Sequence, residues 1–539
     1  MDMAMVTATE NMVLKTPSPG LSKAIIRNAV LLSCLGMILL GGRQAHAMQW
    51  QYRPNMTMSE IFDDNLNLSQ AAKVGGEVSE FAPGVIVSGY SPVDSFNLNY
   101  RLQGLYNAQN NDAVNVYHQL HMNSLFQPVA NTFYVQTSSS IGQQNASNSL
   151  LAGDNIAGKN NRAQTETFTV TPYLTPHFGQ YATGLIKEGF TGNYVQMPDN
   201  SAITSTIVNP ISNSHTLLTQ GGLTSGVYFK NFNWSLNYSS KEQHNDSGSL
   251  VRIENYAANT RYFVNRVFSV FTETGYENNG YLTNGAANRI KNGFYYTVGG
   301  KWQPSWWYSL QAGFGNNSQA TLRFNPSENM TSHVTYYYKT VGLNLGSSWN
   351  AGVNYTTSMS KWVLSYGQET STVQDLLANQ DVFASNPLTG GGLTPGFNFS
   401  LPSLVNDVII SKTADINFTY RTGKSVISAS VFNTRRNYQF SQEFDTLYGA
   451  SANWQWQAIP RLTYHLRPFW QSTETTSRTS FNSQYYGVST GLTRGIPINL
   501  GRPLVLNSSL ELRHVEQSSS GSGASYIENR ATANFFVQF

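Results

Sequence analysis

Hydrophobic and polar residues alternate one by one over long stretches of this sequence. One face of the stretch 94–106 is apolar and contains Phe96, Leu98, Tyr100 and Leu102, and the other contains Asn97, Asn99, Arg101 and Gln103. Residues 231–240 repeat the scheme with Phe232, Trp234, Leu236 and Tyr238, and residues 446–456 with Tyr448, Ala450, Ala452, Trp454 and Trp456. Helical spacing is scarce. A period of two predicts β-strands with two different faces.

The connections between these segments alternate between short turns and long polar loops. We expect short turns at 90–94, 128–131, 177–180, 227–231, 264–266, 303–305, 346–349, 421–424, 458–460 and 494–502. We expect long loops at 61–77, 108–114, 143–162, 195–212, 241–249, 278–290, 317–329, 371–405, 438–446, 473–482 and 517–524. Outer-membrane barrels show this alternation, with tight periplasmic turns and longer extracellular loops.

One stretch, residues 350–370, admits two interpretations. The segment "TSMSK" at 357–361 resembles a turn that would divide it into two strands. A turn there would break the alternation of long and short connections, so we interpret 350–370 as one strand. The pattern therefore predicts an all-β fold, a transmembrane antiparallel up-and-down β-barrel of about 22 strands, within a range of roughly 18–24.

Composition favours a barrel over a soluble β-sandwich, which also alternates. Charged residues make up only 12% of the chain, whereas aromatic residues reach 13%. The outer face of a sandwich usually carries many Lys and Glu residues, but the polar face here consists mostly of amides and hydroxyls. Such a face fits a wet lumen, and an apolar face rich in Tyr, Trp and Phe fits lipid with an aromatic girdle.

The last residues continue the alternation to the end of the sequence. Phe535, Val537 and Phe539 lie on one face, and polar residues lie between them. A barrel must pair its last strand with its first to leave no free edge. The stretch resembles the assembly signal of outer-membrane barrels through Thr532, Val537 and Phe539, although Asn534 stands where a glycine is expected. We therefore expect the barrel-assembly machinery to recognise it.

The first residues predict export. Lys23 and Arg27 precede an apolar run from Ala29 to Leu40, and "AHA" at 45–47 has a small-x-small cleavage pattern. This predicts an N-terminal extension with a cleaved signal peptide over residues 1–47 and a mature barrel over residues 48–539. The alternative is an uncleaved membrane anchor, for which the run is short. The only cysteine, Cys34, would be lost on cleavage.

Three segments resemble one family. They are "QYRPNMTMSEIFDDNLNLS" (51–69), "FAPGVIVSGYSPVDSFNLNYRLQGLYNAQ" (81–109) and "HQLHMNSLFQPVANTFYVQTSSSIGQQN" (118–145). They look like the uncharacterised outer-membrane β-barrel proteins associated with PEP-CTERM systems, which pair the protein-sorting transpeptidase exosortase with exopolysaccharide production. The resemblance implies a Gram-negative outer-membrane location and these genomic neighbours, and it carries over no catalytic residue.

Few residues suggest chemistry. His118 and His121 are three apart, which places them on opposite faces of a strand. Asp63, Asp64, Asn65 and Asn67 offer oxygen ligands for calcium, but Asx residues also form turns by bonding their own backbone, and we favour turns. The segment 389–396 lacks the ending of a phosphate loop. We expect no catalytic site, cofactor or metal, and no nucleic-acid partner.

Charge is distributed unevenly along the mature chain. Residues 48–250 hold eight Lys/Arg and thirteen Asp/Glu, whereas residues 421–539 hold eleven Lys/Arg and six Asp/Glu. In a closed barrel this would set a basic wall opposite an acidic one, unless loop charges average out. The candidate lumen cations are Arg435, Arg436, Arg461, Arg467, Arg494 and Arg513.

Three functional classes follow. The first is a channel or export pore for exopolysaccharide or small solutes, and the second is an anchoring barrel that presents its loops to the surface matrix. The third, a barrel enzyme, lacks a visible Ser/His or Asp/His pairing. The long stretch 371–405 is the best candidate to fold inward, because long loops without structure usually have a function. A plugged lumen would favour anchoring or gating.

Overall fold

The computed structural model describes residues 48–108, 114–198, 207, 209–281, 291–380, 382–383, 397–476, 480–499, 501, 503–521 and 523–539. The expected signal peptide and the glycine-rich segment 389–396 lie outside these residues.

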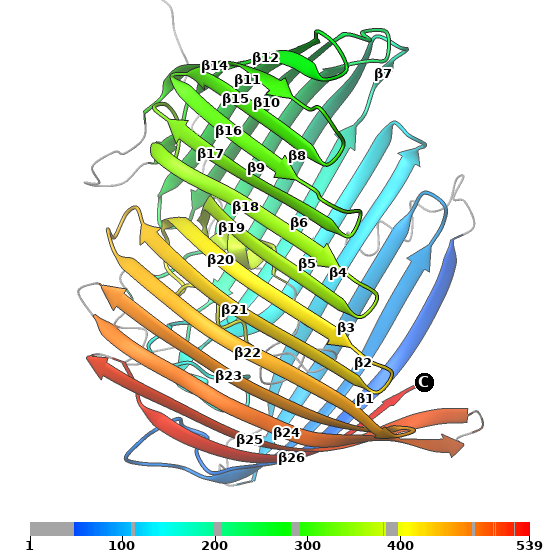
Figure 1. Cartoon of the computed structure of the whole chain (residues 1–539). Coiled ribbons are helices and arrows are strands. Elements are labelled where there is room, and N and C mark those ends of the chain that lie inside the picture. Colours follow the sequence, from blue (N-terminus) through cyan, green and yellow to red (C-terminus); the bar gives the residue numbers. More distant parts are fainter. Residues whose placement is uncertain are drawn as a thin grey trace, which may run out of the picture. The chain divides into compact units, whose positions relative to one another are not determined.

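The described chain from Met48 onward forms a closed antiparallel β-barrel (Figure 1). Neighbouring strands in sequence pair with each other, and β26 pairs with β1 from Asn55↔Gln538 to Asp63↔Arg530. Twenty-four strands cross the described wall, because the two-residue strands β7 and β13 only extend it at its ends. The predicted fold class is confirmed, including the pairing of the last strand with the first.

The strands of the first half are β1 (Gln49–Asp63), β2 (Gly76–Tyr90), β3 (Ser95–Asn107), β4 (Asn115–Val129), β5 (Phe133–Asn145), β6 (Arg162–Leu174), β7 (His177–Phe178), β8 (Ala182–Gln196), β9 (Ser214–Ser225), β10 (Phe232–Asn245), β11 (Leu250–Phe263), β12 (Phe268–Glu277) and β13 (Gly280–Tyr281). Those of the second half are β14 (Gly293–Trp302), β15 (Tyr308–Gly315), β16 (Asn317–Phe324), β17 (Met330–Lys339), β18 (Gly346–Thr356), β19 (Ser360–Thr372), β20 (Val408–Arg421), β21 (Ser425–Tyr438), β22 (Phe444–Ile459), β23 (Leu462–Thr476), β24 (Phe481–Asn499), β25 (Pro503–Gly521) and β26 (Tyr526–Gln538).

The strand number exceeds our central expectation by two, and both extra strands lie between residues 315 and 372. The expected loop 317–329 contains β16, which pairs with β15 and β17. The expected single strand 350–370 is divided by a turn, in which Thr357 N–H donates to the Ser360 carbonyl. The expected turn at 346–349 was wrong, since these residues begin β18. Because two strands are added, the total number of strands stays even, as expected.

The two faces of the wall differ as the alternation predicts. Large apolar side chains such as Phe232, Leu236 and Trp456 are exposed on the outer surface. Small polar side chains such as Thr297, Ser309 and Thr335 point inward and are buried against their neighbours. Because an outer surface of this kind is stable against lipid rather than water, the fold has the face pattern of a membrane barrel.

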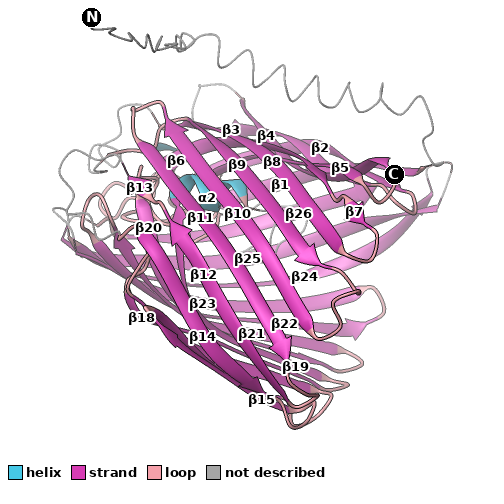
Figure 2. Cartoon of the chain, turned by 90° about the horizontal axis from the view of Figure 1, so that it is seen from above, coloured by secondary structure: helices cyan, strands magenta, loops and turns pink. Residues whose placement is uncertain are grey.

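Within the described residues, helix is almost confined to one connection. The helix α2 (Val373–Ala378) begins with a capping box in which Thr372 and Asp375 satisfy each other's backbone N–H groups. A single 3-10 turn, η1 (Lys159–Asn161), precedes β6. Within the described residues, no helix has the length and apolar content needed to span a membrane. In Figure 2, α2 lies inside the ring of strands.

Candidate functional site: the loops inside the barrel

The described residues of two long connections fold into the barrel. We call residues 146–161, between β5 and β6, inner loop 1. We call the described residues between β19 and β20, which are 373–380, 382–383 and 397–407, inner loop 2. Most of their described residues are buried. The prediction that the stretch 371–405 folds inward is therefore confirmed for its described residues.

An apolar cluster fixes both loops to one part of the wall. The loops contribute Leu150, Leu151, Ala152, Ala157, Phe397 and Phe399, and the wall contributes the inward-facing Phe469, Tyr485, Val515 and Tyr526. The ring of Phe399 lies 5.2 Å from that of Phe469 and 5.1 Å from that of Tyr485, measured between centroids. Burial of such rings is favourable by about 1.5–3 kcal/mol each. The wall is thus apolar on its inner side where the loops cover it.

The two inner loops are also bonded to each other. Leu404 N–H donates to the Ala146 carbonyl at 2.9 Å, and Phe397 N–H donates to the Gly153 carbonyl at 3.1 Å. Asn148 N–H donates to the Ser403 hydroxyl at 3.0 Å. These bonds satisfy backbone groups that would otherwise be buried without partners. The loops therefore form one body across the sequence gap between them.

The helix of inner loop 2 docks on a different part of the wall. The carboxylate of Asp375 pairs with the Lys241 ammonium from β10, and the Thr372 hydroxyl donates to the Gln243 side chain at 2.7 Å. Val373 and Leu377 enter a second apolar cluster with Ile409 and Tyr438. The helix is therefore held by both charge and apolar contacts.

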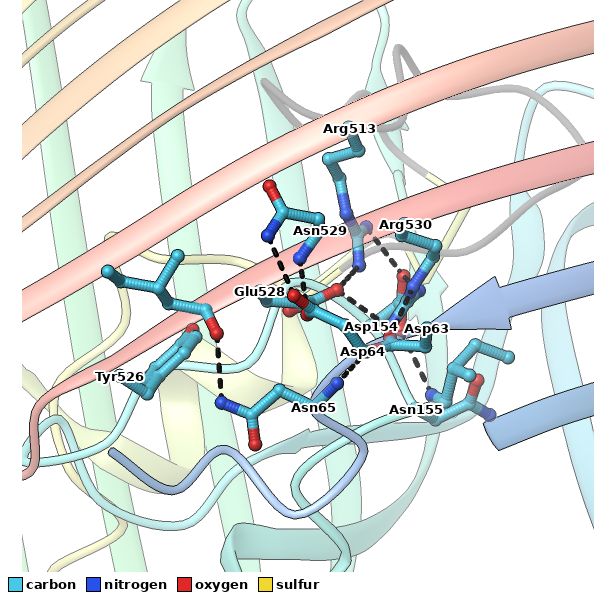
Figure 3. A network of polar contacts seen from close by, with 12 residues as sticks. Asp63, Asp64, Asn65, Asp154, Asn155, Arg513, Tyr526, Glu528, Asn529 and Arg530 are labelled. Carbon is cyan, nitrogen blue, oxygen red and sulfur yellow. Dashed lines mark hydrogen bonds and ion pairs between the residues drawn. The ribbon is translucent and has the colours of Figure 1, made fainter. Parts of the chain in front are cut away.

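One carboxylate of inner loop 1 makes an ionic contact with the wall (Figure 3). Asp154 accepts from Arg513 of β25 at 2.8 Å and from Arg530 of β26 at 2.7 Å. We call these two contacts the Asp154 latch. Around them, the Tyr526 hydroxyl donates to the Leu151 carbonyl, and the Gln517 side chain donates to the Ser149 carbonyl at 2.9 Å.

The two arginines of the latch already have carboxylate partners in the wall. Glu528 lies 2.6 Å from Arg513 and 2.9 Å from Arg530, and Asp63 of β1 lies 2.7 Å from Arg530. Two cations and two carboxylates thus balance without the loop, and Asp154 adds one further negative charge. Removal of a partner from a buried pair is harmful mainly when it leaves an uncompensated charge, and the wall network keeps equal numbers of cations and carboxylates without Asp154.

Attraction to the arginines keeps the loop carboxylate ionised. Burial alone would raise the pKa of Asp154, but the nearby Arg530 and Arg513 guanidinium groups hold it well below its usual range. The Ile156 N–H also donates to this carboxylate, at 3.0 Å. The latch is therefore charged at neutral pH and weakens only in acid.

The Asx cluster of β1 forms turns and closes the seam. Asn65 N–H donates to the Asp63 carboxylate at 2.7 Å, and the Asn65 side chain bonds both Ser69 and the Ile527 carbonyl. Asp64 accepts from the Asn529 backbone and side chain, both at 2.7 Å. Asn67 bonds the backbone of Ala72 and Val74. The interpretation as backbone-bonding turns is confirmed for Asp63, Asn65 and Asn67, whereas Asp64 bonds Asn529 of β26 across the seam.

The two histidines are not brought together. His118 bonds the Tyr100 hydroxyl at 2.9 Å, whereas His121 bonds the Asn123 side chain at 2.7 Å. In the part of the chain that the structure describes, no three His, Cys, Asp or Glu residues are placed to hold a metal.

Three of the six candidate lumen cations face inward, and each is paired with a carboxylate. Arg436 lies 3.4 Å from Asp445, Arg467 lies 3.2 Å from Glu511, and Arg513 belongs to the latch network. The other three do not face the lumen: Arg435 and Arg494 are exposed on the outer face, and Arg461 lies in the turn before β23. For Arg435 and Arg494 the cause is strand register, since a shift of one residue reverses the face of a strand position.

Sequence reasoning missed Asp154, Glu528 and Arg530. Glu528 and Arg530 share the inward parity of Thr532 in the final strand, so their alternation was a usable signal. Asp154 gave no such signal, because it lies in a loop and is 359 residues from Arg513 in the sequence.

No protein-family model and no curated protein matches this sequence. Among solved structures, the chain is similar to the FrpB iron transporter from Neisseria meningitidis (F5-1 variant), with 11% identity, a TM-score of 0.42, and coverage of 93% of this chain and 84% of that one. It is similar to the siderophore receptor PirA from Pseudomonas aeruginosa, with 11% identity, a TM-score of 0.38, and coverage of 91% and 80%. It is also similar to OccK8 (OprE) of the same organism, with 11% identity, a TM-score of 0.28, and coverage of 91% of this chain and 98% of that one. Likeness at this level adds nothing to what the strand pairing itself shows.

Proposed function

We propose that this protein is a channel of the Gram-negative outer membrane whose lumen is gated by inner loops 1 and 2. The closed wall, with apolar side chains outside and polar ones inside, supports a location in lipid. The signal-peptide pattern over residues 1–47 supports export to that membrane.

The Asp154 latch is the observation that carries the gating proposal. A loop that served only to fill space would need apolar contacts alone, whereas this one also makes a separable ionic contact. The wall network remains balanced when Asp154 leaves, so a released state does not strand buried charge. A two-state gate needs such an alternative state within a few kcal/mol of the docked one.

The test is single-channel recording of the purified protein in planar bilayers. We expect Asp154→Asn to raise the open probability, because it removes the loop charge and keeps the shape of the side chain. Replacement of residues 373–405 by a short Gly-Ser linker should raise the conductance further. The matched control is Asp64→Asn, which removes a carboxylate at the same seam that bonds Asn529 and does not touch the inner loops.

Conductance equal to wild type in both loop variants, with normal insertion, would refute gating. The anchoring alternative would then be favoured, since permanently docked loops suit a barrel that presents its surface to a matrix.

We propose further, on the sequence resemblance at 51–69, 81–109 and 118–145 alone, that the channel serves an exosortase-linked exopolysaccharide system. Exopolysaccharide or a small solute would then pass through it. Deletion of the gene in a polysaccharide-producing strain should reduce surface polymer while leaving intracellular polymer in place. Unchanged surface polymer would remove this link without affecting the gating proposal.

A further inference from the structure

A group of cations lies on the inner wall away from the inner loops. Arg261 of β11, Lys301 of β14 and Arg323 of β16 share the inward parity of their strands, as the register with buried Ser269 and Ser309 shows. We call them the basic patch. None of the three was a candidate from sequence.

The patch sits at one level of the barrel. Each cation is one or two residues from the end of its strand, next to the short turns 264–267, 303–307 and 325–329. The neighbouring residues Tyr262, Trp302 and Phe324 point outward and are exposed. An aromatic girdle on the outside thus accompanies positive charge on the inside, at the short-turn end of the barrel.

The three cations repel one another, and none of them is paired with a carboxylate in the part of the chain that the structure describes. Arg261 and Arg323 repel each other, and both repel Lys301. Within the described residues, no ion pair involves any of them, whereas the inward-facing Arg101, Arg436, Arg467, Arg513 and Arg530 are all paired. Like charges held together without a counter-ion attract anions from solution.

The donors around the patch suit an oxyanion. Arg261 is held in place by the Gln311 side chain at 3.0 Å, by the Ser269 hydroxyl at 3.4 Å, and over the Phe271 ring at 5.4 Å. Lys301 is directly opposite Gln311 in the strand register. A guanidinium group presents paired N–H donors that match carboxylate or phosphate oxygens, and an ammonium group adds a mobile charge.

We propose that the basic patch is a binding site for oxyanions carrying two or more negative charges, and that the transported solute is anionic. The second part rests on the proposed channel function. The first part does not, because binding at the patch requires only access from the short-turn end.

Binding is tested by calorimetric titration of sodium tripolyphosphate into the detergent-solubilised protein at low salt. The patch variant is Arg261→Gln/Lys301→Gln/Arg323→Gln. The matched control is Lys424→Gln/Arg461→Gln/Arg494→Gln, which removes the same formal charge from turns and the outer face. We expect the patch variant to bind about tenfold more weakly or worse, and the control to stay within about twofold of wild type. Equal loss in both variants, or no binding by wild type, would overturn the proposal.

Heat-modifiable migration on a gel verifies that the variants are folded, and Lys301→Gln alone provides a milder variant with a smaller loss of binding. Reversal potentials in a KCl gradient then test the transport part, with preference for chloride expected in wild type and reduced in the patch variant. If no variant conducts, the channel function fails while the titration still decides the binding site. If the protein conducts without anion preference, the anionic solute is rejected.

Discussion

The inner wall of this barrel has two parts with different chemistry. We call the part of the wall that contacts the inner loops, from β19 through β26 and from β1 to β10, the covered wall. It presents apolar rings and paired charges to the loops. The uncovered wall, β11 to β18, presents mostly hydroxyls and amides, such as the bonded pair Thr321 and Thr335. Among the described residues, no hydrogen bond or ion pair joins the inner loops to the uncovered wall.

This difference explains how the inner wall of a barrel can hold a loop in the lumen. A polar lumen wall offers no net gain to a loop, because water already satisfies both surfaces. Apolar side chains at positions such as Phe469 and Tyr485 supply the missing driving force. The charges differ in the same sense, since Arg467 and Arg513 of the covered wall are paired with carboxylates, whereas within the described residues no ion pair involves the basic patch of the uncovered wall.

Removal of Val537–Phe539 at the end of β26, a strand of the covered wall, should have the largest effect. We expect no insertion, with degraded or aggregated periplasmic protein. Val537 is buried at the seam, and Phe539 N–H donates to the Pro54 carbonyl at 2.8 Å. One outward ring contributes only about 2–3 kcal/mol by area, so the defect should be in recognition during assembly. Fractionation with heat-modifiable gels measures it.

The controls for this truncation are Gln538→Ala, next to the same ring, and Phe314→Ala on the uncovered wall, where the ring is 76% exposed. Both should insert normally. Full insertion of the truncated protein would show that Thr532, Val537 and Phe539 are not an assembly signal.

Arg530→Met should destabilise the barrel strongly. It leaves Asp63, Asp154 and Glu528 with Arg513 as their one cation within the described network. Uncompensated buried charge of this kind costs about 3–5 kcal/mol. The temperature at which the folded gel band disappears should fall clearly. Arg323→Met on the uncovered wall should leave it unchanged or raise it, because repulsion within the basic patch decreases; equal losses in the two variants would contradict the division of the wall.

Phe469→Ala should release the inner loops without unfolding the barrel. Loss of a buried aromatic ring costs about 3–5 kcal/mol, and each 1.4 kcal/mol changes a population about tenfold. Single-channel open probability should therefore rise. The matched control is Trp470→Ala, the next residue on the same strand, which faces outward and is exposed. An identical open probability in the two variants would mean that the apolar cluster does not hold the loops.

Acid should have the smallest effect, limited to low pH. The pKa of Asp154 is lower when the loop is docked than its ordinary value of 3.8, so the docked state binds fewer protons than the released state. The contribution of the latch is therefore complete above that ordinary value and decreases as pH falls below it. Open probability should rise in that range in wild type and stay flat in Asp154→Asn. A similar acid response in the variant would assign the effect to other groups.

The alternation of hydrophobic and polar residues was sufficient to predict the fold class but not the full number of strands. The octapeptide of β16, Asn317–Phe324, looked like a polar loop, yet it alternates, with Leu322 and Phe324 outward and Thr321 and Arg323 inward. The turn after β18 was a possible interpretation of residues 357–361, but it was rejected because one extra turn would have broken the alternation of long and short connections. Short strands joined by unremarkable turns are where period-two reasoning fails.

The site was predictable only in part. The length of 371–405 indicated that this loop folds inward, because long ordered loops need contacts. The lumen cations were less predictable, because strand register decides which of Arg435 and Arg436 faces inward. The Asp154 latch joins residues that only the closure of the barrel brings together. The uneven charge along the sequence predicted a basic wall, but Arg436, Arg467 and Arg513 are each paired with a carboxylate of the wall.

If the inner loops gate the channel as proposed, the bonds between them determine the form of the electrical signal. Backbone hydrogen bonds join Leu404 to Ala146 and Phe397 to Gly153. Neither loop can leave alone without stranding the backbone groups of its partner. Electrical recordings should therefore show two current levels with direct jumps between them, rather than a staircase of intermediate sublevels, and dwell times in the closed level should follow a single exponential.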